Sequence, residues 1–215
     1  MEILDNARKK IGGSPPPRFT QIAEAVKDEY VSLRAVKIDE TVLRATLGPD
    51  YTRFAQRGVS LPAYLQPQPQ VYQQIFMLTQ QYNLGVDFLV AGIDDFGGHI
   101  SVITNPGTSL SLDKLGYGSV GSGGMHAAIH LSLHGQMTHK QLVQTLYDVY
   151  AAKKIAEIAP GVGIATDLAI VDSTGVWDCT EPLIKALQET FDESGKKITP
   201  KLDKLEKIYS EQHKP

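Results

Sequence analysis

Apolar side chains recur every three or four residues in the first half of the chain, which is the spacing of amphipathic helices. The clearest case covers residues 19–36, where the apolar positions are Phe19, Ile22, Ala23, Val26, Tyr30, Leu33 and Val36. The same spacing predicts a short helix at 1–10 and another at 70–82. Glycine and proline residues interrupt the pattern between these helices. We expect the segment 61–70 to run extended along the surface.

The pattern changes near residue 86, where the features of β-strands begin. Residues 86–94 form a compact apolar run, and 99–107 alternate between apolar and polar side chains. Together with the glycine-containing turn between them, these runs predict a β-hairpin. Asp94 and Asp95 are expected to form the turn and to carry surface carboxylates. Two more strands are expected at 112–120 and 167–175.

Helical spacing returns between the last two of these strands and again at the end of the chain. One helix is predicted at 124–133, and a second follows a possible Thr138–Gln141 capping box and ends before Pro160. Residues after 180 are expected to form a solvated amphipathic tail. The order of elements predicts an α+β fold, with one domain over 1–178, an insertion at 38–82 and a helical C-terminal extension at 179–215. Trp177 and Cys179 are expected to fill the core or a sheet edge.

Composition narrows the function classes. The chain has 215 residues, 42% of them hydrophobic, and a formal net charge of −3. No basic stripe is present, which argues against nucleic-acid binding. No apolar run approaches the roughly 20 residues of a membrane span. The single cysteine cannot form a disulfide framework, so we expect a cytoplasmic protein. The sequence indicates no cofactor.

The stretch "YGSVGSGGMHAAIHLSLHG", residues 117–135, carries the most distinctive candidate chemistry. A glycine-rich turn before a helix can cradle a phosphate, but neither the Walker lysine nor the dinucleotide-binding pattern is present. The spacing around Ser122 does not fit the G-x-S-x-G nucleophile elbow. We therefore expect Gly121, Gly123 and Gly124 to permit close packing, and Ser122 to cap the following helix.

Histidines at spacing four follow this turn. His126, His130 and His134 lie on successive turns of the predicted helix, and a pair spaced i, i+4 can bind a metal ion. His139 or His99 could supply a further ligand. The favoured interpretation is that these imidazoles pack along a sheet or a subunit contact.

Residues 84–175 resemble the central part of proteasome β-type subunits. The resemblance rests on "VDFLVAGIDDFGGHISVITNPGTSLSLDKLGYGSVGSGGMHAAIHLSLHG", in which two strands, a bend and a Gly-Ser-Gly turn precede a helix. The stretch "MTHKQLVQTLYDVYAAKKIAEIAPGVGIATDLAIVDSTG" resembles the family's next helix and strand. This family of N-terminal nucleophile (Ntn) hydrolases has a four-layer α-β-β-α sandwich fold. The resemblance therefore implies that sandwich for this chain, in an N-terminally incomplete form.

The resemblance also implies a mechanism and shows where this chain departs from it. In the family, an N-terminal threonine attacks the peptide carbonyl, and the serine of the Gly-Ser-Gly turn supports the catalytic amino group; that serine matches Ser122. The family's nucleophile, aspartate and lysine lie on strands before its first helix, and this sequence begins at that helix. Without those strands, residues 86–94 would present an unpaired edge, which is a template for pairing with another chain.

These observations predict a proteasome-like subunit that is related to threonine-type self-compartmentalising proteases and is inactive as written. We expect it to form a homo-oligomer or a ring with related subunits, with a polypeptide substrate if it is active and with neither nucleic acid nor membrane as partner. The alternative is a non-catalytic scaffold or assembly protein on the same fold. A more distant alternative is a metal-dependent hydrolase that uses the row of His126, His130 and His134.

Overall fold

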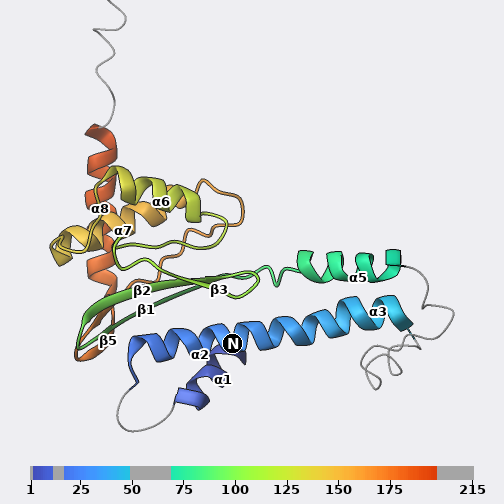
Figure 1. Ribbon diagram of the computed structural model, residues 1–215. Coiled ribbons are helices and arrows are strands. Elements are labelled where there is room, and N and C mark those ends of the chain that lie inside the picture. Colours follow the sequence, from blue (N-terminus) through green and yellow to red (C-terminus); the bar gives the residue numbers. More distant parts are fainter. Residues whose placement is uncertain (1, 12–16, 49–68, 198–215) are drawn as a thin grey trace, which may run out of the picture.

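The computed structural model describes residues 2–11, 17–48 and 69–197, which form an α+β structure with helices on both sides of a small sheet (Figure 1). The expected extended segment at 61–70 lies almost wholly outside these ranges. No helix in the described part of the chain combines the length and apolar character needed to cross a membrane.

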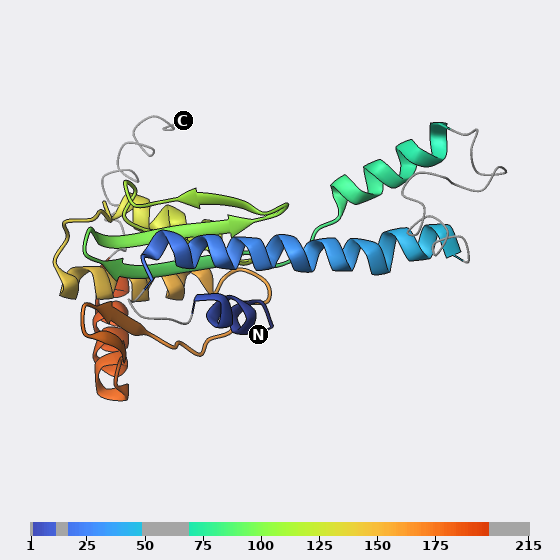
Figure 2. The same ribbon diagram turned by 60° about the horizontal axis from the view of Figure 1, so that its bottom comes forward.

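The N-terminal helices form one layer under the sheet. Their far end, residues 39–47 together with the helix at 69–81, forms a projection that we call the arm. Helix α1 (Glu2–Ile11) packs against α2 (Phe19–Ile38). Helix α2 continues without a break through a π-helical turn, η1 (Asp39–Leu43), into α3 (Arg44–Leu47). Helix α5 (Pro69–Gln81) contacts η1, so that α5 and the end of the long helix project beyond the sheet (Figure 2). The described parts of the predicted insertion at 38–82 are therefore mostly helical.

Arg34 fastens the base of this arm to the sheet. Its guanidinium donates to the carbonyl oxygens of Thr79 at 2.8 Å and Tyr82 at 3.1 Å, which lie at the C-terminal end of α5. It also donates to Asn105 Oδ1, in the turn after the second strand, at 3.1 Å. A cation at a helix C-terminus satisfies carbonyls that have no partner within the helix. Arg34 thereby joins α2, α5 and the sheet.

The sheet is an antiparallel meander of β1 (Phe88–Asp94), β2 (Gly97–Thr104) and β3 (Thr108–Ser111). The predicted hairpin is confirmed. The predicted third strand at 112–120 is wrong, because β2 pairs with 108–111 and residues 112–123 contain neither helix nor strand. The side chains of Ser101 and Ser109 are hydrogen bonded to each other across β2 and β3 at 2.9 Å.

The two faces of the sheet differ in what covers them. We call the face that packs on α2 the helix-covered face; Tyr30 of α2 meets Phe88 edge to face there, beside the fully buried Ile103. Side chains alternate between the faces along a strand. The opposite face, which we call the open face, therefore carries Leu89, Ala91, Ile93, Ile100, Val102 and Leu110.

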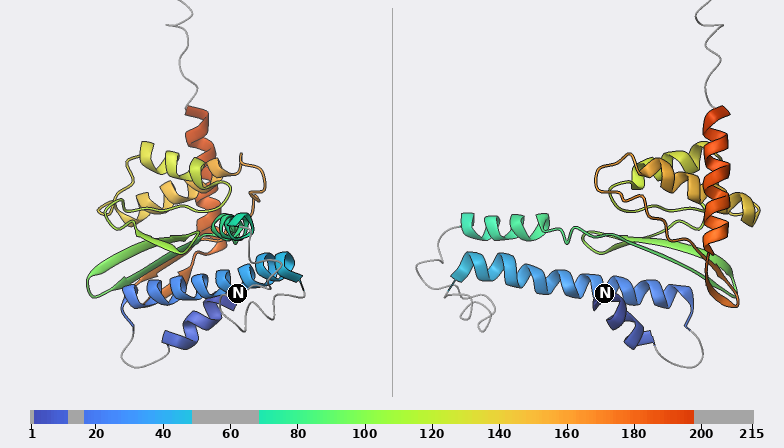
Figure 3. Two further views of the ribbon diagram at one scale, coloured as in Figure 1. Left: turned by 45° about the vertical axis from the view of Figure 1, so that its right-hand side comes forward. Right: turned by 180° about the vertical axis from the view of Figure 1, so that it is seen from behind.

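Two helices lie on the open-face side of the sheet (Figures 1 and 3). Helices α6 (Gly124–Leu133) and α7 (Leu142–Ala156) pack against each other. They are followed by the hairpin β4 (Ala169–Asp172) and β5 (Gly175–Asp178), and then by α8 (Glu181–Lys197). The predicted helices and the fourth strand are confirmed, whereas β5 was not anticipated.

Two local expectations fail in this region. The Thr138–Gln141 capping box does not form, because α7 begins at Leu142 with Gln141 as an N-cap that makes no side-chain bond. The C-terminal extension is not only a solvated tail, since Tyr150 of α7 donates to Gln188 Oε1 of α8 at 2.6 Å and Leu187 is buried. The described part of the extension therefore packs on the body of the fold.

Candidate functional site

The glycine-rich turn lines a cavity of about 770 Å³ between the open face and the α6–α7 pair. The sheet contributes Leu89, Ala91 and Ile100, and the facing helices contribute Ala127, Leu131 and Ala152. Residues 116–124 border the same space. Most of the lining side chains are therefore apolar, as is usual for a pocket of this size.

Ser122 lines this cavity, but it does not cap α6. The N-cap position is Gly123, and no side chain caps the helix. Within the described part of the chain, Ser122 Oγ makes no hydrogen bond, and the residue is exposed. The nearby Ser119 hydroxyl instead donates to the Gly124 carbonyl at 2.7 Å. A serine hydroxyl needs a neighbouring base to become a nucleophile, and Ser122 has no such partner here.

Lys153 borders the cavity and is engaged elsewhere. Its ammonium group pairs with Glu157 one helical turn away and donates to the carbonyl of Gly163 at 3.0 Å. The described residues therefore contain a serine and a lysine at the same cavity without a hydrogen bond between them.

The three glycines of the turn have three different roles. A Cβ on Gly123 would lie 2.8 Å from Ala156 Cβ and 2.9 Å from Val162 Cγ2, so this glycine permits the turn to pack against the end of α7. Gly121 has a φ of +85° with open space around it, and it is needed for its backbone conformation, not for packing as expected. A Cβ on Gly124 would make only ordinary contacts, the nearest at 3.5 Å.

A buried amide gives the apolar cavity one polar end. Gln136 is 7% exposed, and its Nε2 donates weakly to Thr145 Oγ1 at 3.4 Å. Its Oε1 has no hydrogen-bond partner in the described part of the chain. Buried carbonyl oxygens are nearly always paired in folded proteins, so this oxygen marks a position where a donor is expected.

The histidine row does not form a metal site among the described residues, where no three His, Cys, Asp or Glu side chains are placed to hold a metal ion. The rings of His130 and His134 stack with their centroids 4.1 Å apart. Burial, and then the neighbouring His134, lower the pKa of His130. A stacked pair with one half-buried ring fits the packing interpretation. His126 is half-buried, and His139 is exposed.

His99 instead lies between two carboxylates at the rim of the sheet. Its Nε2 is 3.0 Å from Asp94 Oδ1, and its Nδ1 is 2.8 Å from Asp113 Oδ2. Hydrogen bonds with Asp113, and then with Asp94, raise the pKa of His99. The Phe96 amide, followed by His99 and the Phe19 amide, lowers the pKa of Asp94. Burial opposes ionisation of Asp113, but the hydrogen bonds from His99 and the Ile100 amide lower its pKa overall.

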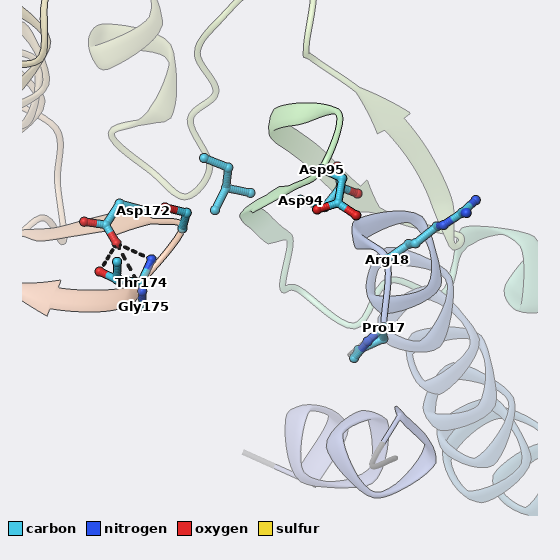
Figure 4. Close-up of a pocket in the computed structure, with 9 residues that line it drawn as sticks. Pro17, Arg18, Asp94, Asp95, Asp172, Thr174 and Gly175 are labelled. Atoms are coloured by element: carbon cyan, nitrogen blue, oxygen red, sulfur yellow. Dashed lines mark hydrogen bonds between the residues drawn. The ribbon is translucent and has the colours of Figure 1, made fainter. Parts of the chain in front are cut away.

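Asp94 also borders a cleft of about 450 Å³ between the start of α2, the β1–β2 turn and the β4–β5 turn (Figure 4). Arg18 and Asp95 lie on one side of this cleft, and Asp172 lies on the other. Asp172 Oδ1 accepts hydrogen bonds from the hydroxyl and the amide of Thr174 and from the Gly175 amide. The hydroxyl bond, more than the others, lowers the pKa of Asp172. This carboxylate is thus occupied in shaping its own turn.

The sequence indicated some of these positions and missed others. Asp94 and His99 were noted, but as a turn former and as a possible metal ligand. Asp113 and Gln136 gave no signal that distinguished them from surface residues.

The chain matches no known protein-family model and none of the curated proteins.

The turn glycines allow a matched test of packing. We expect Gly123→Ala to lower the free energy of unfolding by about 1–3 kcal/mol, because its methyl group meets Ala156 and Val162. Gly124→Ala, in the adjacent position, should leave stability unchanged or raise it by up to about 1 kcal/mol. Ser122→Ala should change it by less than about 0.5 kcal/mol, since no cap is lost. Urea denaturation of the three variants measures these differences, and equal losses for both glycines would contradict the assignment.

Proposed function

We propose that this chain is a proteasome-like subunit of the Ntn-hydrolase type, which works in the cytoplasm as part of an oligomeric assembly. The observation that carries the proposal is the apolar cavity between the open face and the α6–α7 pair. The order of the elements adds support: a hairpin, a glycine-rich turn, a helix pair, a second hairpin and a final helix follow one another. Up to β4, this is the order that the resemblance to proteasome β-type subunits implies, while β5 and α8 lie beyond the part of the chain that carries the resemblance.

The cavity lies on the side of the sheet where an α-β-β-α sandwich would have its second sheet. In an α-β-β-α sandwich, two sheets pack face to face between the helical layers, about 10 Å apart. Here helices lie on both sides, but one three-stranded sheet and a two-stranded hairpin are the only sheets in the described residues. Leu89 and Leu110 of the open face remain 40% and 59% exposed. Burying a fully exposed leucine contributes roughly 1.5–3 kcal/mol, and about half of that is still available at these two positions, so further strands would be stabilised there.

Added strands could also supply hydrogen-bond partners to polar groups that have none among the described residues. The unpaired Oε1 of Gln136 could accept a backbone amide from a strand that enters the cavity. Strand β4 lies beside β1 but forms no ladder with it in the described part of the chain. Backbone groups on that side of β1 are therefore not paired in a sheet. We therefore propose that the open face is an assembly surface of the subunit.

This surface leads to a test by self-association. We expect the purified chain to form oligomers as its concentration rises, and Leu89→Lys, which places a charge on the open face, to shift it toward the monomer. Leu4→Lys is the matched control, because Leu4 is 50% exposed and lies on α1, on the other side of the sheet. Sedimentation velocity over a hundredfold concentration range provides the measurement.

Two outcomes would count against the assembly surface. One is a wild-type chain that stays monomeric over the whole range. The other is an equal effect of Leu89→Lys and Leu4→Lys, which would place the contact away from the open face.

The second candidate is a non-catalytic scaffold on the same fold. It is favoured by the position of Ser122, which lacks a hydrogen-bonded base, and by the engagement of Lys153 with Glu157. Threonine-type hydrolysis would need a nucleophile and a base supplied from outside the described residues. The two candidates share the fold and differ only in chemistry.

A peptidase assay tests the expectation, common to both candidates, that this 215-residue chain does not cleave peptides. We expect the purified 215-residue chain to cleave short fluorogenic peptides no faster than the buffer, because the described residues supply no activated nucleophile. The Ser122→Ala variant is the control and should behave identically. Cleavage that is lost in Ser122→Ala would show that Ser122 is a nucleophile. Cleavage that is lost only after the α-amino group is blocked would favour an N-terminal nucleophile.

A further inference from the structure

The bonds around His99 require a particular protonation state. Carboxylate oxygens only accept hydrogen bonds, and a neutral imidazole has one donor and one acceptor nitrogen. Both ring nitrogens of His99 lie within hydrogen-bond distance of a carboxylate, at 2.8 Å from Asp113 and 3.0 Å from Asp94. While both aspartates are ionised, the two bonds can exist together only when the ring carries two protons and a positive charge. Loss of one proton must therefore break one of them and leave a lone pair facing a carboxylate.

This charged cluster joins elements that are far apart in the sequence. Asp94 Oδ2, at the end of β1, accepts the backbone amide of Phe19 at 3.2 Å, in the first turn of α2. The Phe19 ring stacks on the His99 ring with the centroids 5.1 Å apart. Asp113 Oδ1, beyond β3, accepts the Ile100 amide at 2.8 Å. His99 therefore holds the segment after β3 and the start of α2 against the same end of the sheet, near the β1–β2 turn.

Two carboxylates near His99 favour its protonated form, and the other charged groups nearby contact different partners or solvent. Asp94 and Asp113 are the two carboxylates that act on it. From α2, the neutral Phe19 packs on the ring, while the Arg18 guanidinium lies 5.6 Å from the centre of the Phe96 ring. Asp95, in the β1–β2 turn, is exposed, and Asp172 is bonded within its own turn across the cleft.

We infer that Asp94, His99 and Asp113 form a pH-sensitive latch that fastens the N-terminal turn of α2 to the rim of the sheet. The latch is closed while His99 is an imidazolium and both aspartates are ionised. When His99 loses its proton, the contact with Asp94 or with Asp113 weakens, and the first turn of α2 is held less firmly beside the cleft. This inference is independent of the proposed proteasome-like function.

The pH range follows from the directions of the pKa shifts. The pKa of His99 is raised in the folded protein, so its contribution to stability is complete below its unfolded pKa of about 6.5. That contribution is lost as the pH rises through the folded value. The pKa values of Asp94 and Asp113 are lowered, so their contribution is complete above about pH 4 and is lost as the pH falls through the folded values. The latch should hold best between these limits and open on the alkaline side.

Nuclear magnetic resonance of the full chain tests the latch. The ¹⁵N shifts of the His99 ring should show both nitrogens protonated at pH 6 and should titrate above pH 6.5. Over the same titration, the protection factor of the Phe19 amide, corrected for the intrinsic pH dependence of exchange, should fall by about fivefold, because its acceptor Asp94 is held less firmly once the bond between Asp94 and His99 is lost. In His99→Gln this step should be absent, whereas in His139→Gln, a change of an exposed histidine, it should remain.

A second variant keeps the test informative if His99→Gln does not fold. Asp113→Asn removes one carboxylate while preserving the shape of the side chain, so it should move the His99 titration to lower pH. Titration of wild-type His99 at or below pH 6.5 would overturn the latch. So would a Phe19 protection factor that stays constant while His99 loses its proton.

Discussion

The architecture depends on the packing of α2 against one face of the three-stranded sheet. Tyr30 and Val26 of α2 are buried against Ile103 of β2, and α1 adds Ile3 and Ala7 to the same core. This contact orients the sheet so that its second apolar face points toward α6 and α7. The cavity lies between this second face and the two helices, and the glycine-rich turn borders it.

The periodicity of the sequence predicted the elements well where each had one clear apolar pattern. The hairpin of β1 and β2 and helices α6 and α7 follow directly from spacings of two and of three to four. The third strand was misplaced because β3 is short and carries serines on the helix-covered face, where Ser109 meets Ser101. The apolar pattern of β3 is therefore weaker than that of residues 112–120. Those residues pack on the sheet without forming a strand: Gly118 lies so close to Leu89 and Leu112 that a Cβ would not fit.

The candidate sites were less predictable because they depend on register and on tertiary contacts. Asp94 and His99 share a face of the hairpin once the pairing of Gly92 with His99 is known. Asp113 joins them only because the chain turns back after β3, which the misplaced strand concealed. Ser122 was expected to cap α6, but Gly123 occupies that position. The Oε1 atom of Gln136 is buried by the packing between α6 and α7, and this tertiary contact cannot be predicted from a local sequence pattern.

The central claim is that the open face is covered when the subunit assembles, and thiol reactivity at that face tests it most directly. A cysteine replaces Ala91, which is exposed and borders the cavity, in a chain whose own Cys179 is changed to serine. The account predicts that alkylation of this thiol slows at least about tenfold as the protein concentration is raised into the range where oligomers form, since burial removes the thiol from the reagent. Alkylation at one constant rate in monomer and oligomer would contradict it.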